Sequence, residues 1–141
     1  MEKVKQTRIV VFGTFDFLHP GHIHKFAQAR KLAKHPYLIV SVATDKNVKR
    51  IKGQVAHYSQ NERARLLSSC KLVDQVVFGA QSDYLGSIVK LKPDIIALGY
   101  DQVAYTDNLE KLLLNRGLKV TVVRLKAYKP HIFKTQKFKG K

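Results

Sequence analysis

The stretch "RIVVFGTFDFLHPGH" (residues 8–22) starts as an apolar run and passes directly into a turn that contains glycine, proline and histidine. Apolar residues in succession are typical of a strand that is covered on both faces, as in a parallel sheet. Pro20 is tolerated in the first turn of a helix, and apolar residues recur every three or four positions from 23 to 33. The stretch therefore predicts a strand over residues 8–13 and a helix over about 20–34.

The same alternation continues along the chain. Further short runs rich in Val and Ile predict strands over residues 37–43, 74–79, 94–99 and 119–125. Helical patterns lie between them, and one begins with Ser59 and Glu62 in the spacing of a capping box, while another ends at Gly117 as a C-cap. We expect one α/β domain over residues 1–125, Rossmann-like and doubly wound, with a five-stranded parallel sheet flanked by helices.

Charge is the most unusual property of the composition. The 141 residues include 26 Lys and Arg but only 10 Asp and Glu, so the net charge is +16. Such a surface attracts nucleotides, nucleic acids and anionic lipids alike. The tail over residues 126–141 contains six lysines and no acid, and we expect either a basic lid of the same domain or a frayed end.

Two absences narrow the class of protein. Cys70 is the single cysteine, which excludes an internal disulfide framework and a multi-cysteine zinc site, and fits a reducing compartment. The start of the chain has no export signal, and no apolar stretch reaches the ~20 residues that span a bilayer. We expect a cytoplasmic protein without a membrane anchor.

The turn over residues 13–22 follows the first strand, at the edge of a doubly wound sheet where ligands bind. Its glycines allow a ligand to approach the backbone, and His19 and His22 bracket a helix start that favours anions. A metal site is disfavoured because no carboxylate or cysteine completes the spacing of these histidines with His24. A lone histidine at this place would ordinarily be interpreted as a helix cap. The presence of two histidines favours a phosphate-binding site instead.

The passage "GTFDFLHPGH" resembles the H-x-G-H signature of the nucleotidyltransferase superfamily that contains glycerol-3-phosphate and phosphoethanolamine cytidylyltransferases and archaeal-type FAD synthases. The likeness continues in order through "ATDKNVKRIKG", "NERARLL", "VDQVVFG", "KLKPDIIALGYDQ" and "VVRLKAYK". The fourth of these segments and the "YK" of the last most resemble archaeal FAD synthases. Those enzymes join FMN to the AMP moiety of ATP and release pyrophosphate.

The resemblance implies a role for each matching residue. The catalytic positions are His19, His22, Lys52 and Arg63. The nucleotide-binding positions are Gly13, Thr14, Phe15, His19, Gly21, His22, Gly99, Asp101, Arg124, Lys126 and Thr135. The acceptor-binding positions are Asp45, at the end of the second strand, Lys52 and Arg63. Mg²⁺ would be held by the triphosphate, with Asp45 beside it, and by no protein site alone.

The resemblance also implies ATP (or CTP) and FMN or another phosphorylated acceptor as substrates, and a homodimer. The tail departs from the relatives because it keeps only Thr135 of a hydroxyl-rich segment. Two alternatives to an FMN adenylyltransferase stay open. One is a CTP-dependent cytidylyltransferase that acts on glycerol 3-phosphate or a similar small alcohol phosphate. The other is a nucleic-acid-binding protein on an inactive nucleotidyltransferase fold. We rank it lower because aromatic residues are not interleaved with the basic ones, as single-strand binding usually requires.

Overall fold

The computed structural model describes residues 4–100, 102 and 108–127. Strands and helices alternate along this part of the chain. In chain order they are β1 (Thr7–Gly13), α1 (Pro20–Arg30), β2 (Pro36–Val42), α2 (Asp45–Lys52), α3 (Gln60–Ser68), β3 (Gln75–Phe78), α4 (Tyr84–Leu91), β4 (Ile95–Leu98), α5 (Leu109–Asn115) and β5 (Thr121–Arg124).

The strands form one parallel sheet in the order β3-β2-β1-β4-β5. β1 lies in the middle, where Val10 pairs with Ile39 of β2 on one side and Ile96 of β4 on the other. The chain first builds outward from β1 to β3 and then returns to place β4 beside β1. The order of the strands therefore reverses between β1 and β4, which is where open α/β sheets bind their ligands.

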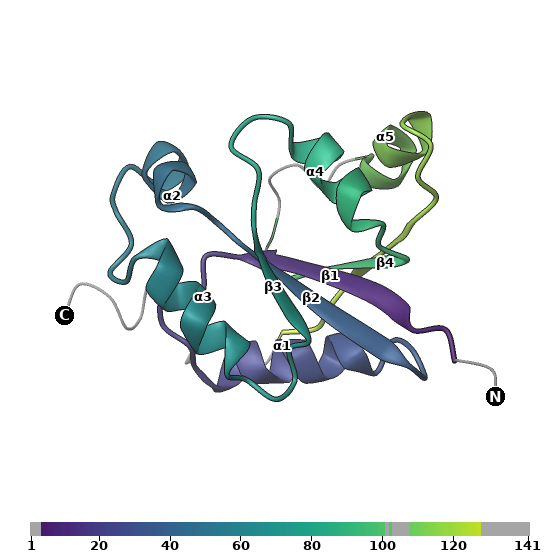
Figure 1. The fold of residues 1–141 in the computed structure, drawn as a ribbon, viewed down its shortest axis with the longest axis horizontal. Coiled ribbons are helices and arrows are strands. Elements are labelled where there is room, and N and C mark those ends of the chain that lie inside the picture. Colours follow the sequence, from purple (N-terminus) through teal and green to yellow (C-terminus); the bar gives the residue numbers. More distant parts are fainter. Residues whose placement is uncertain (1–3, 101, 103–107, 128–141) are drawn as a thin grey trace.

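Helices cover both faces of the sheet (Figure 1). α1 and α3 lie on one face and α4 and α5 on the other, while α2 follows the carboxyl end of β2. Each face has its own apolar core: one contains Phe26 of α1 and Leu67 of α3, the other Ile88 of α4 and Leu113 of α5. This confirms the predicted Rossmann-like, doubly wound fold with a five-stranded parallel sheet.

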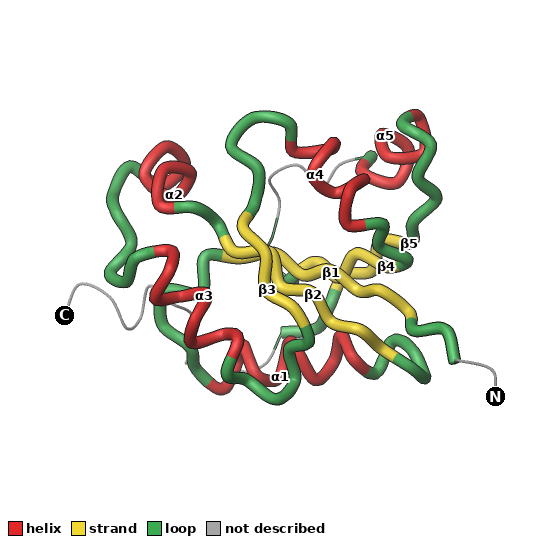
Figure 2. Tube along the Cα trace, in the orientation of Figure 1, coloured by secondary structure: helices red, strands yellow, loops and turns green. Residues whose placement is uncertain are grey.

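Long loops gather at the carboxyl edge of the sheet, beside α2 and the start of α3 (Figure 2). The predicted basic lid falls on residues 126–141, of which all beyond 127 lie outside the described residues. Within the described ranges, no helix has both the length and the apolar character needed to cross a membrane.

Two helices differ from the prediction. α1 ends at Arg30 rather than near residue 34, with Lys31 as its C-cap. α2 was not predicted at all, because its eight residues contain only two apolar ones, Val48 and Ile51, which are too few to establish a helical period. Its ends are nevertheless marked: Thr44 Oγ1 accepts a hydrogen bond from the Asn47 N–H, and Gly53 closes the helix at φ 78°.

The predicted capping box at α3 is present and can be tested. The hydroxyl of Ser59 accepts from the N–H of Glu62 at 3.2 Å, and the Glu62 carboxylate accepts from the N–H of Ser59 at 3.0 Å. We expect Ser59→Ala to lower the free energy of unfolding by about 1 kcal/mol. Urea denaturation measures the change.

Ser68→Ala, at the exposed end of the same helix, is the matched control for this prediction. Its hydroxyl donates to the carbonyl of Ala64 within the helix, so we expect a change of less than about 0.5 kcal/mol. Equal effects of the two substitutions would contradict a stabilising role for the capping box.

Candidate active site

The turn after β1 is shaped by an aromatic ring. Phe15 has a left-handed backbone (φ 54°), and its side chain is 4% exposed in the core beneath α1. A Cβ added at Gly13 would lie 2.7 Å from two atoms of this ring. Gly13 was expected to admit a nucleotide, and here the ring of Phe15 already requires a residue without a side chain.

His19 caps helix α1. Its Nδ1 accepts a hydrogen bond from the Gly21 N–H at 3.1 Å, so the helix-cap interpretation is realised in the structure. Because Nδ1 acts as an acceptor, the proton of the neutral ring resides on Nε2. The cap therefore fixes the tautomer of His19 and makes Nε2–H its donor.

His22 lies under His19 and against Phe15. The two imidazoles stack with their centroids 3.9 Å apart, and the Phe15 ring meets His22 edge-on at 5.2 Å. Burial, together with the nearby His19 and Lys25, lowers the pKa of His22 to about 3. Among the described residues, Nδ1 of His22 is buried and has no hydrogen-bond partner. Buried polar atoms of native structures are nearly always hydrogen-bonded, so this nitrogen is a candidate contact for a bound water or ligand.

Arg63 holds three loops together from inside the protein. It belongs to the first half of α3, and its side chain has no exposed surface. Nη1 donates to the carbonyls of Thr14 and Ala43, each at 2.8 Å. Nε donates to the carbonyl of Tyr58 at 3.0 Å, and Nη2 pairs with Asp45 at 2.7 Å. All three nitrogens of the guanidinium thus donate to protein oxygens, and the contact of Arg63 with a phosphate stays a prediction.

Two carboxylates complete this framework. Asp16 is 1% exposed and accepts from the N–H groups of His57 and Tyr58 at 2.6 and 2.8 Å. Asp45 does not end the second strand as expected, because β2 stops at Val42 and Asp45 opens α2. Its side chain is 46% exposed, and its second oxygen accepts from the N–H of Gln60 at 3.1 Å.

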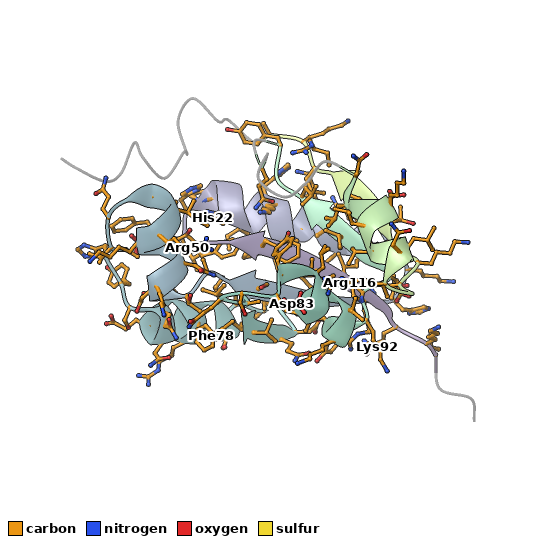
Figure 3. The ribbon with its side chains drawn as sticks, turned by 90° about the horizontal axis from the view of Figure 1, so that it is seen from above. His22, Arg50, Phe78, Asp83, Lys92 and Arg116 are labelled. Atoms are coloured by element: carbon orange, nitrogen blue, oxygen red, sulfur yellow. The ribbon has the colours of Figure 1, made fainter. Side chains whose placement is uncertain are left out.

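The structure separates Lys52 from the other predicted acceptor residues. Lys52 is the last residue of α2 and is exposed, whereas Asp45 is the first. At 1.5 Å of rise per residue, the two backbones lie about 10 Å apart along the helix axis. Figure 3 shows His22 at the same end of the molecule as Arg50, which belongs to α2 like Asp45 and Lys52.

The carboxyl end of β4 forms the opposite wall. The Gly99 N–H donates to the side chain of Gln102 at 2.6 Å, and Arg124 donates to the carbonyls of both residues. Lys126 is fastened through its backbone, which exchanges two hydrogen bonds with the side chain of Gln28. Nη1 of Arg124 is thus bound to the turn after β4, and the contact of Arg124 with a triphosphate stays a prediction. Asp101 and Thr135, the remaining predicted contacts, lie outside the described residues.

Lys25 joins these two walls, and its place was not predicted. Its Nζ donates to the carbonyl of Phe12 at 3.1 Å and lies 5.4 Å from the centre of the Phe15 ring. The side chain of Gln102 donates to the same carbonyl at 3.1 Å. The signal in the sequence is the spacing, because Lys25 follows His22 by three residues and shares its helix face.

No cluster of three or more His, Cys, Asp or Glu side chains within the described ranges has the arrangement of a metal site. Asp45 can still lie beside a metal ion, since magnesium is commonly bound through one or two carboxylates and substrate phosphates. The arrangement instead offers imidazole and ammonium groups at a helix start, which suits binding of a phosphorylated ligand.

The burial of Arg63 makes a prediction about stability. Arg63→Met would leave three carbonyls and one carboxylate without their donor, and we expect a loss of about 3–5 kcal/mol in the free energy of unfolding. Arg65→Met, at an exposed position of the same helix, should change it by less than about 0.5 kcal/mol. Chemical denaturation of both variants measures the difference, and similar stabilities would contradict the bracing role.

The lowered pKa of His22 makes a prediction about pH. The unfolded chain binds a proton near pH 6.5, whereas the folded state does so only near pH 3. Stability contributed by neutral His22 is therefore complete above pH 6.5 and falls as the pH drops toward 3. Between these limits we expect wild type to lose about 1.4 kcal/mol per pH unit more than His22→Asn.

Urea denaturation at pH 7.5, 5.5 and 4.5 measures this difference in slope. The value at pH 7.5 gives the baseline stability of the variant, so a general loss of packing is separated from the pH effect. Parallel pH profiles of the two proteins would show that His22 is not held neutral by the fold.

Comparison with known proteins places this site in a family. The model of the cytidylyltransferase-like family matches residues 10–139. A FAD synthase of Thermococcus sibiricus is 43% identical over 139 residues, which cover 97% of this chain and 93% of that protein. A FAD synthase of Archaeoglobus profundus is 45% identical over 120 residues, covering 85% and 75% of the two chains.

Two solved structures share the fold of this chain. The crystal structure of a lipopolysaccharide core biosynthesis protein from Thermoplasma volcanium superposes with a TM-score of 0.81 at 35% identity, over 89% of this chain and all of that one. A protein of unknown function from Archaeoglobus fulgidus shares the fold, with a TM-score of 0.65 at 16% identity, over 85% and 90% of the two chains. The chain thus belongs to the cytidylyltransferase-like family and is a nucleotidyltransferase.

Proposed function

We propose that this chain is an FMN adenylyltransferase, which transfers AMP from ATP to FMN and yields FAD and pyrophosphate. The observation that carries the proposal is its likeness to archaeal FAD synthases, which reaches 97% of the chain in one of them. The geometry supports it, because a helix start and two stacked histidines lie at the edge of the sheet where a nucleotide binds.

The reaction exchanges one phosphorus–oxygen bond for another. A phosphate oxygen of FMN attacks the α-phosphorus of ATP, and the bond from that phosphorus to the bridging oxygen breaks. Pyrophosphate leaves with the electron pair. The attacking phosphate is already ionised at neutral pH, so no general base is required. Holding the two reactants in place can lower the barrier by ~7–11 kcal/mol.

The protein's remaining task is to offset negative charge on the α-phosphate and the leaving group. His19 presents Nε2–H as a donor, because its Nδ1 is committed to the cap. His22 is neutral in the free protein, and a phosphate beside it would raise its pKa and favour the charged ring. We assign both histidines to the phosphates, and Arg63 and Asp45 to the framework that positions the loops around them.

Magnesium fits this site as a partner of the triphosphate, where it would neutralise charge on the phosphates. Asp45 has the partly exposed carboxylate needed to lie beside such an ion, but both its oxygens already accept hydrogen bonds. We therefore place the ion mainly on the nucleotide. The enzyme is proposed to act in the cytoplasm as a homodimer, and analytical ultracentrifugation tests the second point.

A CTP-dependent cytidylyltransferase acting on a small alcohol phosphate is the second candidate, favoured by the family model that matches the chain. The two candidates differ in both substrates. Incubation with ATP or CTP, FMN or glycerol 3-phosphate, and Mg²⁺ separates them by product. FAD formation with ATP supports the adenylyltransferase, and turnover only with CTP and the alcohol phosphate overturns it.

His22 provides the test of the site. We expect His22→Asn to lower kcat for FAD formation by ~10²–10³, comparable to the loss of one transition-state donor, while the protein stays folded. His35→Asn, an exposed histidine before β2, is the matched control and should keep the wild-type kcat. If His22→Asn lost both its activity and, by circular dichroism, its folded structure, the histidine would serve the helix rather than the reaction.

A further inference from the structure

Lys25 occupies the point where the order of the strands reverses. Its ammonium is hydrogen-bonded to the Phe12 carbonyl near the end of β1, at 3.1 Å. A Cβ added at Gly99, directly after β4, would lie 3.4 Å from the same nitrogen. The charged group therefore lies between the carboxyl ends of the two central strands, at the mouth of the crevice that binds ligands in this class of fold.

Lys25 and His22 share one environment. They lie three residues apart on α1 and face the same side of the helix. The Phe15 ring contacts both, with its centroid 5.2 Å from the centre of the His22 ring and 5.4 Å from Nζ of Lys25. The positive charge of Lys25 is also one cause of the lowered pKa of His22.

This arrangement holds a cation in place before any substrate arrives. The lysine is half-buried, and its ammonium is fixed by a carbonyl on one side and an aromatic face on the other. A donor that is already ordered loses less conformational entropy when it binds a ligand. Lys25 lies one turn further along α1 than His22, and six residues beyond the His19 cap.

We propose that Lys25 is a further nucleotide-binding residue, whose ammonium contacts the α-phosphate of the bound nucleotide beside His22. The nucleoside enters the crevice between β1 and β4, so its nearest phosphate is the α-phosphate, while the distal phosphates extend over the helix start. Lys25 thus adds a fixed positive charge at the phosphorus that is transferred. The inference deepens the proposed function and rests on it for the choice of adenine nucleotides.

Binding of AMP and of adenosine, measured by calorimetry without flavin, tests the contact. Lys25→Gln keeps a donor for the Phe12 carbonyl but removes the charge, and we expect it to weaken AMP binding by about 10- to 100-fold. Adenosine, which has no phosphate, should bind wild type and variant equally. Lys25→Arg keeps the charge and should restore AMP binding to within a few-fold. Lys31→Gln, at the exposed end of the same helix, should change neither affinity.

Each other outcome overturns the contact. Equal weakening of AMP and adenosine would place Lys25 against the base or ribose, and unchanged AMP binding would leave it a structural residue. Weakening of ATP without weakening of AMP would place it on a distal phosphate. If wild type binds CMP and not AMP, the proposed donor is wrong, and the same comparison with CMP and cytidine still decides the role of Lys25.

Discussion

The guanidinium of Arg63 is the interaction on which the candidate site depends. Three loops that follow or precede separate elements present their carbonyls to this one buried group, at Thr14, Ala43 and Tyr58. The loop after β1 is held a second time, because Asp16 accepts hydrogen bonds from the backbone that precedes α3. A planar cation with fixed donor directions ties these loops more rigidly than apolar packing would. The loop that leads from β1 to His19 and His22 is therefore held by two sets of hydrogen bonds.

In the free protein, the ammonium of Lys25 lies close to the uncharged, partly buried imidazole of His22. Burial and the neighbouring cation both oppose protonation of His22, so the ring is uncharged at neutral pH. A phosphate beside the ring would favour its charged form and supply a hydrogen-bond partner for the imidazole. Ionisable side chains whose pKa is shifted by burial and by a neighbouring charge are common at functional sites. The excess of lysine over the whole chain, with its net charge of +16, would attract the same anions from a distance.

Much of the architecture was predictable because its signals are local. Continuous apolar runs identified each strand, and the Ser59 and Glu62 spacing identified the start of α3. α2 escaped prediction because a short, charged helix with only two apolar residues gives too weak a pattern, although caps mark both its ends. The position of the turn that contains the histidines was predictable, and its motif made the family predictable as well. The burial of Arg63 was not, since a sequence does not show which arginine meets inward-facing carbonyls.

The contact between Phe15 and Gly13 has a consequence for how this turn can change over generations. The ring occupies the volume that any side chain at position 13 would need, and it reaches that volume only through the left-handed backbone of Phe15. A methyl group at 13 is therefore accommodated only alongside a smaller residue at 15. The ring also forms the surface shared by His22 and Lys25. Sequence drift at these two positions would have to be paired, and each paired step would alter the surroundings of the imidazole.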